Sequence, residues 1–357
     1  MLPPWLLKYH PAANGCASCP ECLPALKGRT FAKSLTPSFP VDIVYTWVDG
    51  GDPAHSAKRA KMMGHGEQLI PENSCPGRFR DNDELKYSLR SLEKYAPWAR
   101  SIFILTDQQK PAWLNEDHPK VQIVDHRDCI PHQFLPTFNA QVIEAYLHKI
   151  PGLAEHFIYF NDDVFLGRPT QKTDFFTPNG LPVTFVDWRW RRRFGYWYTK
   201  TSHACSYFNM VKLLQQKHLP VEKKFVSAHG PLAQTQANVQ EVFSVFADFI
   251  TNFSSNTFRG LNEIGMYSHA APLYMYAKKR VIPCDTTYYY VQTQRKDRHA
   301  YFSGILRSKD TVAAPLFFCI NDVGGLPGED WADDLHHLLE SYFPESSSFE
   351  KPLPQYS

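Results

Sequence analysis

The chain has 357 residues, which is enough for one large domain or two smaller ones with a sizeable buried core. Its 38 lysines and arginines nearly balance its 36 aspartates and glutamates, so bulk charge does not indicate a nucleic-acid-binding protein. No apolar run reaches the roughly 18 residues of a membrane span, and the first residues lack the pattern of a secretory signal. We therefore expect a cytoplasmic protein.

Residues 1–40 are rich in structure-breaking residues and are expected to form an irregular N-terminal arm. Three of the eight cysteines, Cys16, Cys19 and Cys22, form a C-x-x-C-x-x-C cluster there. Zinc would need a fourth ligand, so a flexible arm with reduced thiols is the default interpretation and a metal site is the alternative. The other five cysteines are expected to be reduced core residues.

The next segment alternates short apolar runs with helical patterns. The runs at 43–48, 101–106, 121–124 and 157–160 are nearly continuous, which is typical of strands buried on both faces. Between them, 83–95 and 138–148 have apolar residues at helical spacing. This alternation predicts the α/β class with an open, mostly parallel, Rossmann-like sheet.

The second half is less regular. A helical insertion is expected at about 189–258, and its clearest helix is at 239–250. Residues 182–188, 286–291 and 316–320 have strand character, and a helix at 331–343 closes the main domain, which spans 41–343. Residues 344–357, rich in serine and proline, are expected to form a disordered tail.

Acidic residues follow four of the predicted strands at the point where each strand ends. Ligands of an open α/β sheet bind beyond the carboxyl ends of its strands, so these side chains are expected to meet. Their mutual repulsion predicts a bound cation, and Mg²⁺ or Mn²⁺ on a diphosphate is the usual occupant. Such a site is typical of a transferase that uses a nucleotide sugar. The residues, in chain order, are Asp49, Gly50, Asp52, Asp107, Asp125, Asn161, Asp162 and Asp163.

Basic and capping residues precede the helix predicted at 83–95. The N-terminus of a helix favours an anion, so Arg80 could hold a phosphate oxygen. Asp81 and Asn82 are residue types that cap helices, and this structural role is expected as well.

Later loops add further candidates. His229 could accept the proton of an attacking hydroxyl, although a structural histidine is the alternative. Arg259 is a second basic candidate, and Asn321 with Asp322 forms another acidic strand end. The segment at 188–193 interleaves two tryptophans with four arginines and is suited to an anionic polymer or membrane surface.

Several ordered blocks resemble the Stealth family of sugar-1-phosphate transferases, which includes bacterial capsule polymerases and the N-acetylglucosamine-1-phosphotransferase of lysosomal enzymes. The blocks are 42–52 (DIVYTWVDGGD), 78–91 (RFRDNDELKYSLRS), 96–106 (APWARSIFILT), 135–139 (LPTFN) and 156–166 (HFIYFNDDVFL). Residues 229–231, Phe258-Arg259 and 319–322 are similar to two later blocks of that family, although Val323 stands where a second aspartate is common.

The resemblance implies a GT-A-like sheet and a defined reaction. An acceptor hydroxyl attacks the β-phosphate of a UDP-sugar, typically UDP-N-acetylglucosamine, sugar-1-phosphate is transferred, and UMP leaves. The matched positions imply a role for each residue. Arg80 and Arg259 would contact phosphate, and Asp162, Asp163 and Asp322 would bind a metal. The base would be His229 or Asp81, and His229 is favoured because its neutral form is available near pH 7. The residues expected to bind substrate are Asp49, Gly50, Asp52, Asn82, Asn161 and Asn321.

Two other functions stay open. An ordinary GT-A-type glycosyltransferase would release UDP, and a non-catalytic carbohydrate- or anion-binding protein would show no turnover. The resemblance places the chain in bacterial capsule or exopolysaccharide synthesis, with a UDP-sugar donor and a saccharide or polysaccharide acceptor. The segment at 188–193 or the N-terminal arm could hold it at the inner face of the membrane.

Overall fold

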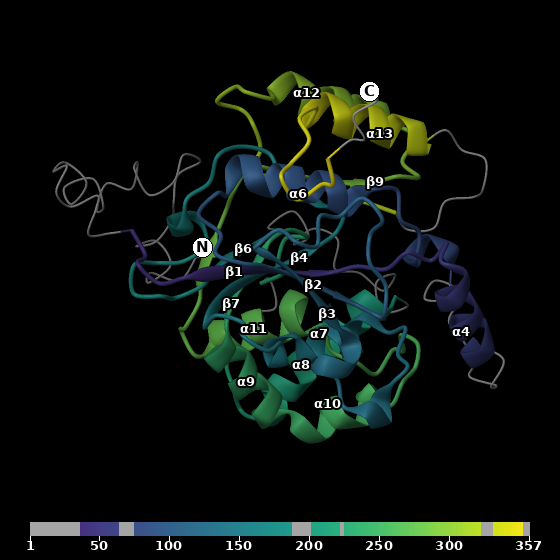
Figure 1. The fold of residues 1–357 in the computed structure, drawn as a ribbon. Coiled ribbons are helices and arrows are strands. Elements are labelled where there is room, and N and C mark those ends of the chain that lie inside the picture. The colour runs from purple at the N-terminus through teal and green to yellow at the C-terminus, as the bar shows by residue number, and fades with distance from the viewer. Residues whose placement is uncertain (1–35, 64–74, 188–200, 222–224, 323–330, 353–357) are drawn as a thin grey trace, which may run out of the picture.

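A five-stranded sheet forms the centre of the protein (Figure 1). The structure is a computed structural model that describes residues 36–63, 75–187, 201–221, 225–322 and 331–352. Its strand order is β3-β2-β1-β4-β7, and only β7 runs antiparallel to its neighbour. The predicted open, mostly parallel α/β fold is therefore confirmed. The bounds are β1 (Val41–Thr46), β2 (Ile102–Thr106), β3 (Val121–Asp125), β4 (His156–Asn161) and β7 (Leu232–Thr235).

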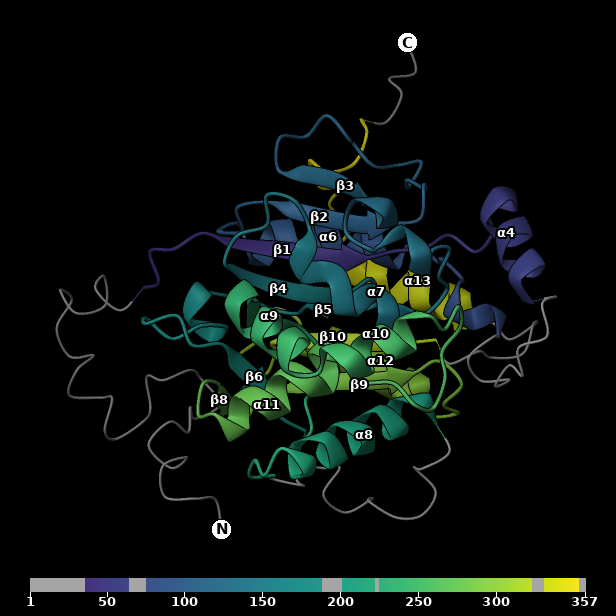
Figure 2. The ribbon, with the colours of Figure 1, turned by 90° about the horizontal axis from the view of Figure 1, so that it is seen from below.

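Helices cover both faces of this sheet, as Figures 1 and 2 show. On one side lie α6 (Glu84–Tyr95) and, beyond it, α12 (Arg298–Ser308) and α13 (Trp331–Tyr342). The other side carries α7 (Ala140–Tyr146), α8 (Ser202–Gln216), α9 (Gln236–Val245), α10 (Ala247–Ser254) and α11 (Ala271–Ala277). Helix α4 (Pro53–Met63) projects from the edge of the molecule.

Alternate residues of β1 enter two separate cores, because successive side chains of a strand point to opposite faces. Ile43 and Tyr45 pack in one cluster with Leu89 of α6. Val44 packs in the other with Val142 of α7. All of these side chains are fully buried. This explains why the strand is apolar along nearly its whole length.

A second sheet adjoins the end of β4. It has the order β5-β10-β9, with β5 (Val164–Leu166) antiparallel to β10 (Phe317–Asn321) and β9 (Tyr288–Gln292) parallel to it. Only the turn at Asp162 and Asp163 separates β4 from β5, so these two residues lie where the two sheets meet. Strands β6 (Val183–Phe185) and β8 (Ile282–Cys284) form a separate parallel pair.

The segment expected to be a helical insertion also contributes to the main sheet. Strand β7 lies within it and pairs with β4. The helix expected at 239–250 is two helices, α9 and α10, because Phe246 has a non-helical backbone with φ −116° and ψ 25°. Residues 138–148 likewise form α7 followed by a short 3-10 turn.

The tail prediction was wrong for residues 344–352. Phe349 is buried, and the Arg90 guanidinium of α6 donates hydrogen bonds to both Glu350 carboxylate oxygens at 2.8 and 2.9 Å. The serine and proline content indicated a segment with little apolar surface to bury, but this ion pair, with side chains only 7% and 8% exposed, anchors it to the core. Residues 353–357 lie outside the described ranges.

Replacing Glu350 with glutamine is expected to lower the free energy of unfolding by about 3 kcal/mol, because it leaves the buried Arg90 charge with only the exposed Glu340 carboxylate as an ionic partner. Glu116→Gln is the matched control: its pair with Lys110 is about half exposed, and we expect a loss below about 1 kcal/mol. Urea titration measures both values. Equal losses in the two variants would contradict a special role for Glu350.

The same contact predicts how stability depends on pH. Burial acts to raise the pKa of Glu350, but the hydrogen bonds from Arg90 and Ser347 outweigh it and hold the pKa below its usual range. A lowered folded-state pKa means that the stabilisation is present above the ordinary glutamate pKa of about 4.3 and is lost as pH falls through the lowered value. Glu350→Gln should therefore remove part of the acid sensitivity of unfolding.

No helix within the described ranges is long and apolar enough to cross a membrane. The cysteine cluster at Cys16, Cys19 and Cys22 and the arginine-rich segment at 188–193 lie outside those ranges, so both remain predictions from sequence.

Candidate active site

A pocket of about 440 Å³ opens at the carboxyl ends of β1 and β4. Strand β1 pairs with β2 on one side and β4 on the other, so the chain reverses its direction of winding here, and ligands of α/β sheets bind at such points. Thr46 at the end of β1 and Trp47 after it line the wall. Asn161 at the end of β4 lines it too, with Asp162 and Asp163 directly after the strand. The pocket therefore lies where the strand ends predicted it.

The Asn161 side chain links β4 to the predicted base. Tyr159 Oη donates to Asn161 Oδ1 at 2.7 Å and also contacts Thr46 Oγ1 at 3.0 Å. Because the Asn161 oxygen is engaged in this way, its amide nitrogen faces His229 Nε2 at 3.3 Å and donates to it. Nε2 is then the unprotonated nitrogen of the ring, as a proton acceptor requires.

His229 is held in the pocket by a loop that presses against β10. Gly230 approaches Phe317 so closely that a Cβ atom at this position would lie 2.1 Å from the ring, so only glycine fits. The backbone N–H of Ala228 donates to the carbonyl of Phe185 at 2.7 Å, which fixes the other side of the loop. Burial lowers the pKa of His229, assisted by the Arg259 charge, while Asp163 acts in the opposite direction. The imidazole is therefore neutral at pH 7.

Carboxyl groups gather in and behind the opposite wall. Burial raises the pKa of Asp162 well above its usual range, and the nearby carboxylates Asp163, Glu84 and Asp81 raise it further. Burial similarly raises the pKa of Glu84 to about 7 and that of Asp81 to about 6. A cation would offset this repulsion, and carboxylate oxygens are the donors that Mg²⁺ or Mn²⁺ prefers, but among the described residues no three of these carboxylates lie within 4.8 Å of one another.

The last predicted block reaches the same place through β10. Asn321 Nδ2 donates to Asp163 Oδ2 at 3.0 Å, which joins the ends of β10 and β4. Asp322 accepts from Arg80 Nη1 at 3.2 Å, and the Arg80 guanidinium also lies 5.3 Å from the Trp331 ring centroid. Arg80 thus lines the pocket, but its guanidinium is paired with the Asp322 carboxylate, whereas the sequence predicted that it would contact a phosphate.

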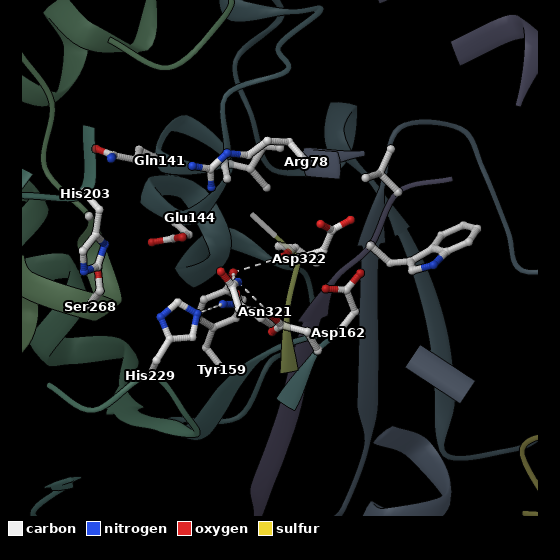
Figure 3. A pocket seen from close by; sticks show the side chains of 18 of the residues that line it. Arg78, Gln141, Glu144, Tyr159, Asp162, His203, His229, Ser268, Asn321 and Asp322 are labelled. Atoms are coloured by element: carbon white, nitrogen blue, oxygen red, sulfur yellow. Dashed lines mark hydrogen bonds between the residues drawn. The ribbon is translucent and has the colours of Figure 1, made fainter. Parts of the chain in front are cut away.

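Glu144, His203 and Arg78 are among the pocket residues that the sequence analysis did not propose for the site. Figure 3 shows Glu144 and His203 facing the side that carries Asp162, Asn321 and Asp322, with Arg78 nearby. Burial raises the pKa of Glu144 to about 7, while the Arg259 charge lowers it. Glu144 could have been recognised as the one acidic residue in an otherwise uncharged helix, α7. His203 and Arg78 carry no comparable local signal.

Six predicted residues do not line the pocket: Asp49, Gly50, Asp52, Asp81, Asn82 and Asp125. The first three form the turn before α4. Asp49 Oδ1 accepts from the Gly51 N–H, and Asp52 Oδ1 accepts from the Ala54 N–H at the start of the helix.

The residues before α6 form a second turn behind the wall. The N–H and side-chain amide of Asn82 both donate to Glu84, and Asp81 Oδ1 accepts from the Asp83 N–H. These residues shape the walls, and Asp81 also contributes its charge to Asp162.

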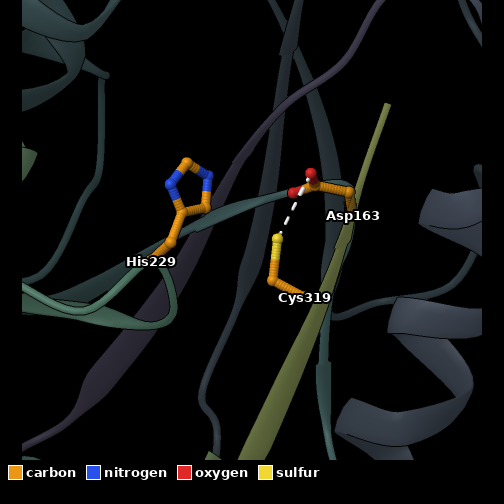
Figure 4. Close-up of side chains that lie close together, drawn as sticks. All are labelled: Asp163, His229 and Cys319. Atoms are coloured by element: carbon orange, nitrogen blue, oxygen red, sulfur yellow. Dashed lines mark hydrogen bonds between the residues drawn. The ribbon is translucent and has the colours of Figure 1, made fainter. Parts of the chain in front are cut away.

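One cluster in the described residues has the composition and spacing of metal ligands. A ligand atom from each of Asp163, His229 and Cys319 lies within 4.8 Å of the others (Figure 4). This set mixes oxygen, nitrogen and sulfur donors. It therefore differs from the all-oxygen set predicted at Asp162, Asp163 and Asp322.

Comparison with known proteins identifies the family. Residues 39–67 match the family model of Stealth protein conserved region 1, and residues 78–184 match that of conserved region 2. The capsular polysaccharide phosphotransferase fcs1 of Haemophilus influenzae is 35% identical over 310 residues, covering 85% of this chain and 84% of that protein. The chain belongs to the Stealth family. The resemblance in the sequence motifs is confirmed.

Other Stealth relatives extend the match to more of the chain. A capsular polysaccharide phosphotransferase of Neisseria meningitidis serogroup B is 35% identical and covers 88% of this chain and 85% of its own length. LcbA of Aeromonas hydrophila, named in the same way, is 32% identical and covers 95% of each chain. Among solved structures, the galactosyltransferase LgtC in complex with donor and acceptor sugar analogs is 12% identical, and the alignment covers 88% of this chain and 98% of LgtC. Its TM-score of 0.43 is below the level that indicates a shared fold.

Proposed function

We propose that this Stealth protein transfers sugar-1-phosphate from a UDP-sugar to a saccharide hydroxyl in capsule or exopolysaccharide synthesis. The donor is UDP-N-acetylglucosamine or another UDP-hexose. The acceptor oxygen forms a bond to the β-phosphorus, and the bond from that phosphorus to the oxygen of the α-phosphate breaks. UMP leaves with this oxygen, the acceptor proton passes to a base, and the product is a phosphodiester.

One observation carries the proposal: the pocket brings a neutral histidine together with arginines and an excess of carboxylates. His229 supplies the base, because its ring is held neutral with Nε2 unprotonated. Nε2 has one lone pair, so the acceptor hydroxyl takes the place of the Asn161 amide there before its proton is transferred. Arg259 and Arg78 line the same pocket and supply positive charge for a diphosphate. The named relatives are capsular polysaccharide phosphotransferases, which supports the same class of reaction here.

Asp162, Asp163 and Asp322 would hold a Mg²⁺ or Mn²⁺ ion, which would neutralise the charge that builds up on the leaving UMP. Asn321 orients Asp163 through its hydrogen bond, and Arg80 orients Asp322. Glu144, opposite them, is suited to binding hydroxyl groups of the sugar or acceptor, because a carboxyl with a pKa of about 7 both donates and accepts hydrogen bonds.

Identifying the nucleotide product tests the proposal. Incubation with a panel of UDP-sugars, Mg²⁺ and saccharide acceptors should yield UMP and a phosphodiester, and prior removal of the metal with a chelator should abolish turnover until Mg²⁺ or Mn²⁺ is restored. Release of UDP would instead establish a glycosyltransferase. Saccharide binding without turnover, unchanged in Asp162→Ala, would establish the non-catalytic alternative.

The setting of the reaction belongs to the same proposal. UDP-sugars are made in the cytoplasm, and contact with the inner membrane face through residues 188–193 would bring the enzyme to a growing polysaccharide. Sedimentation with anionic vesicles tests this contact. Replacement of the four arginines of that segment with serine should leave the protein in the supernatant.

A further inference from the structure

Cys319 lies beside the proposed base and has no part in the transfer described above. It is fully buried in β10, and its Sγ donates to Asp163 Oδ2 at 3.4 Å. His229 completes the cluster, with ligand atoms of all three side chains within 4.8 Å of one another. A thiol, an imidazole and a carboxylate in such proximity form a ligand set, which an ordinary core cysteine does not.

All three side chains are positioned by β10. Cys319 belongs to this strand and pairs with Val164 of β5, the residue directly after Asp163. The Ile320 N–H donates to the Asp163 carbonyl at 3.1 Å, which fixes the backbone of the aspartate. The loop of His229 rests on Phe317 of the same strand through Gly230. The backbone positions of the three residues are therefore set by the fold.

One atom of the cluster lacks a hydrogen bond. Asp163 Oδ2 accepts from Cys319 and Asn321, but Oδ1 is buried and has no hydrogen-bond partner among the described residues. A buried carboxylate oxygen without a partner is costly, and a bound ion is one of the few arrangements that satisfy it. The thiol-to-carboxylate hydrogen bond accounts for Oδ2 and leaves Oδ1 open to an ion.

We propose that Asp163, His229 and Cys319 form a binding site for a thiophilic divalent cation of the Zn²⁺ class. Thiolate and imidazole ligands select such ions, whereas Mg²⁺ prefers oxygen. Zinc bonds of roughly 2.0–2.3 Å place ligand atoms of one tetrahedron under about 4 Å apart, so a small closure of the cluster suffices. The thiol proton passes to solvent on binding, and the fourth position stays open to water.

This site goes beyond the proposed function and has a consequence for it. Asp163 belongs to both ligand sets, so Zn²⁺ and Mg²⁺ compete, and a coordinated His229 can no longer accept a proton. If the proposed function holds, added Zn²⁺ slows transfer and a chelator followed by Mg²⁺ restores it. If Zn²⁺ binds without slowing transfer, His229 is not the base, and the cation site itself stands.

Metal titration of the full-length chain tests the site directly. Because Cys16, Cys19 and Cys22 could also bind zinc, the background carries Cys16→Ser, Cys19→Ser and Cys22→Ser. After removal of metals, competition with a chromophoric chelator should show one Zn²⁺ bound per chain. Co²⁺ in the same protein should give the near-ultraviolet charge-transfer band of a cobalt–thiolate bond. Absence of both signals overturns the proposal.

Variants locate the ligands. Cys319→Ser should remove the Co²⁺ band and weaken Zn²⁺ binding by more than about tenfold, since loss of even an outer-shell partner usually costs that much. Cys284→Ser is the matched control: Cys284 is also buried, lies outside the cluster, and its replacement should leave both signals unchanged. Circular dichroism confirms folding. If Cys319→Ser misfolds, Asp163→Asn is measured instead. Zn²⁺ affinity equal to that of the parent in either folded variant overturns the proposal.

Discussion

Replacing His229 with glutamine is expected to lower kcat for sugar-phosphate transfer by about 10²–10⁴-fold, the usual contribution of a positioned proton acceptor. Glutamine keeps a similar size and can still accept a hydrogen bond from Asn161, so the loop should stay in place. The acceptor hydroxyl, however, would then lose its proton only to water. UMP release under saturating donor and acceptor measures the effect, and the KM for the UDP-sugar should change far less than kcat.

Asp81→Asn is the comparison that decides between the two base candidates. Asp81 does not line the pocket, and burial raises its pKa to about 6. It affects the pocket through its charge, which raises the pKa of Asp162. We expect this substitution to change activity far less than His229→Gln. A larger loss in Asp81→Asn, with His229→Gln still active, would transfer the role of base to the aspartate.

Replacing Arg259 with alanine is expected to lower kcat by about 10²–10³-fold, the effect of removing one preorganised group that stabilises developing charge. Its guanidinium acts electrostatically on His229, His203 and Glu144, which places its charge at the centre of the pocket. Its loop is rigid, because the Phe258 ring stacks on Phe138 with centroids 5.4 Å apart and the Asn139 amide donates to the Phe258 carbonyl at 3.2 Å.

Arg127→Ala is the matched control for this experiment. Arg127 follows a strand of the main sheet, is exposed, pairs with Asp125 and does not line the pocket. Its replacement should leave kcat within about twofold of the parent, because a surface ion pair contributes little. Arg259→Lys adds a test of geometry: a single ammonium cannot replace a planar, two-pronged donor, so only partial recovery is expected. Equal activity of Arg259→Ala and Arg127→Ala would exclude Arg259 from phosphate binding.

Much of the central fold could be predicted because it depends on local patterns. Continuous apolar runs identified β1, β2, β3 and β4, and helical spacing identified α6. Burial on both faces of β1, β2 and β4 leaves this signal in the residues themselves, and the edge strand β3 has it although Gln122 is exposed. Strand β7 was missed, because it is a short edge strand whose pairing with β4 is made by tertiary contact. The tail at 344–352 was misjudged for the same reason, since its anchor is the distant Arg90.

The candidate site, like the fold, has parts that local sequence patterns predict and parts that depend on tertiary contacts. The order of residues alone placed Asn161, Asp162 and Asp163 at the end of a buried strand, and with the other motif blocks it identified the family. It could not show that Asp49 and Asp52 are engaged in a turn, or that Arg80 is paired with Asp322. Nor could it place Glu144 and Cys319 in the pocket region. The turn is local, but the Arg80–Asp322 pair and the Cys319–Asp163 contact join residues 242 and 156 positions apart. Only the tertiary arrangement of the two sheets decides that these side chains meet.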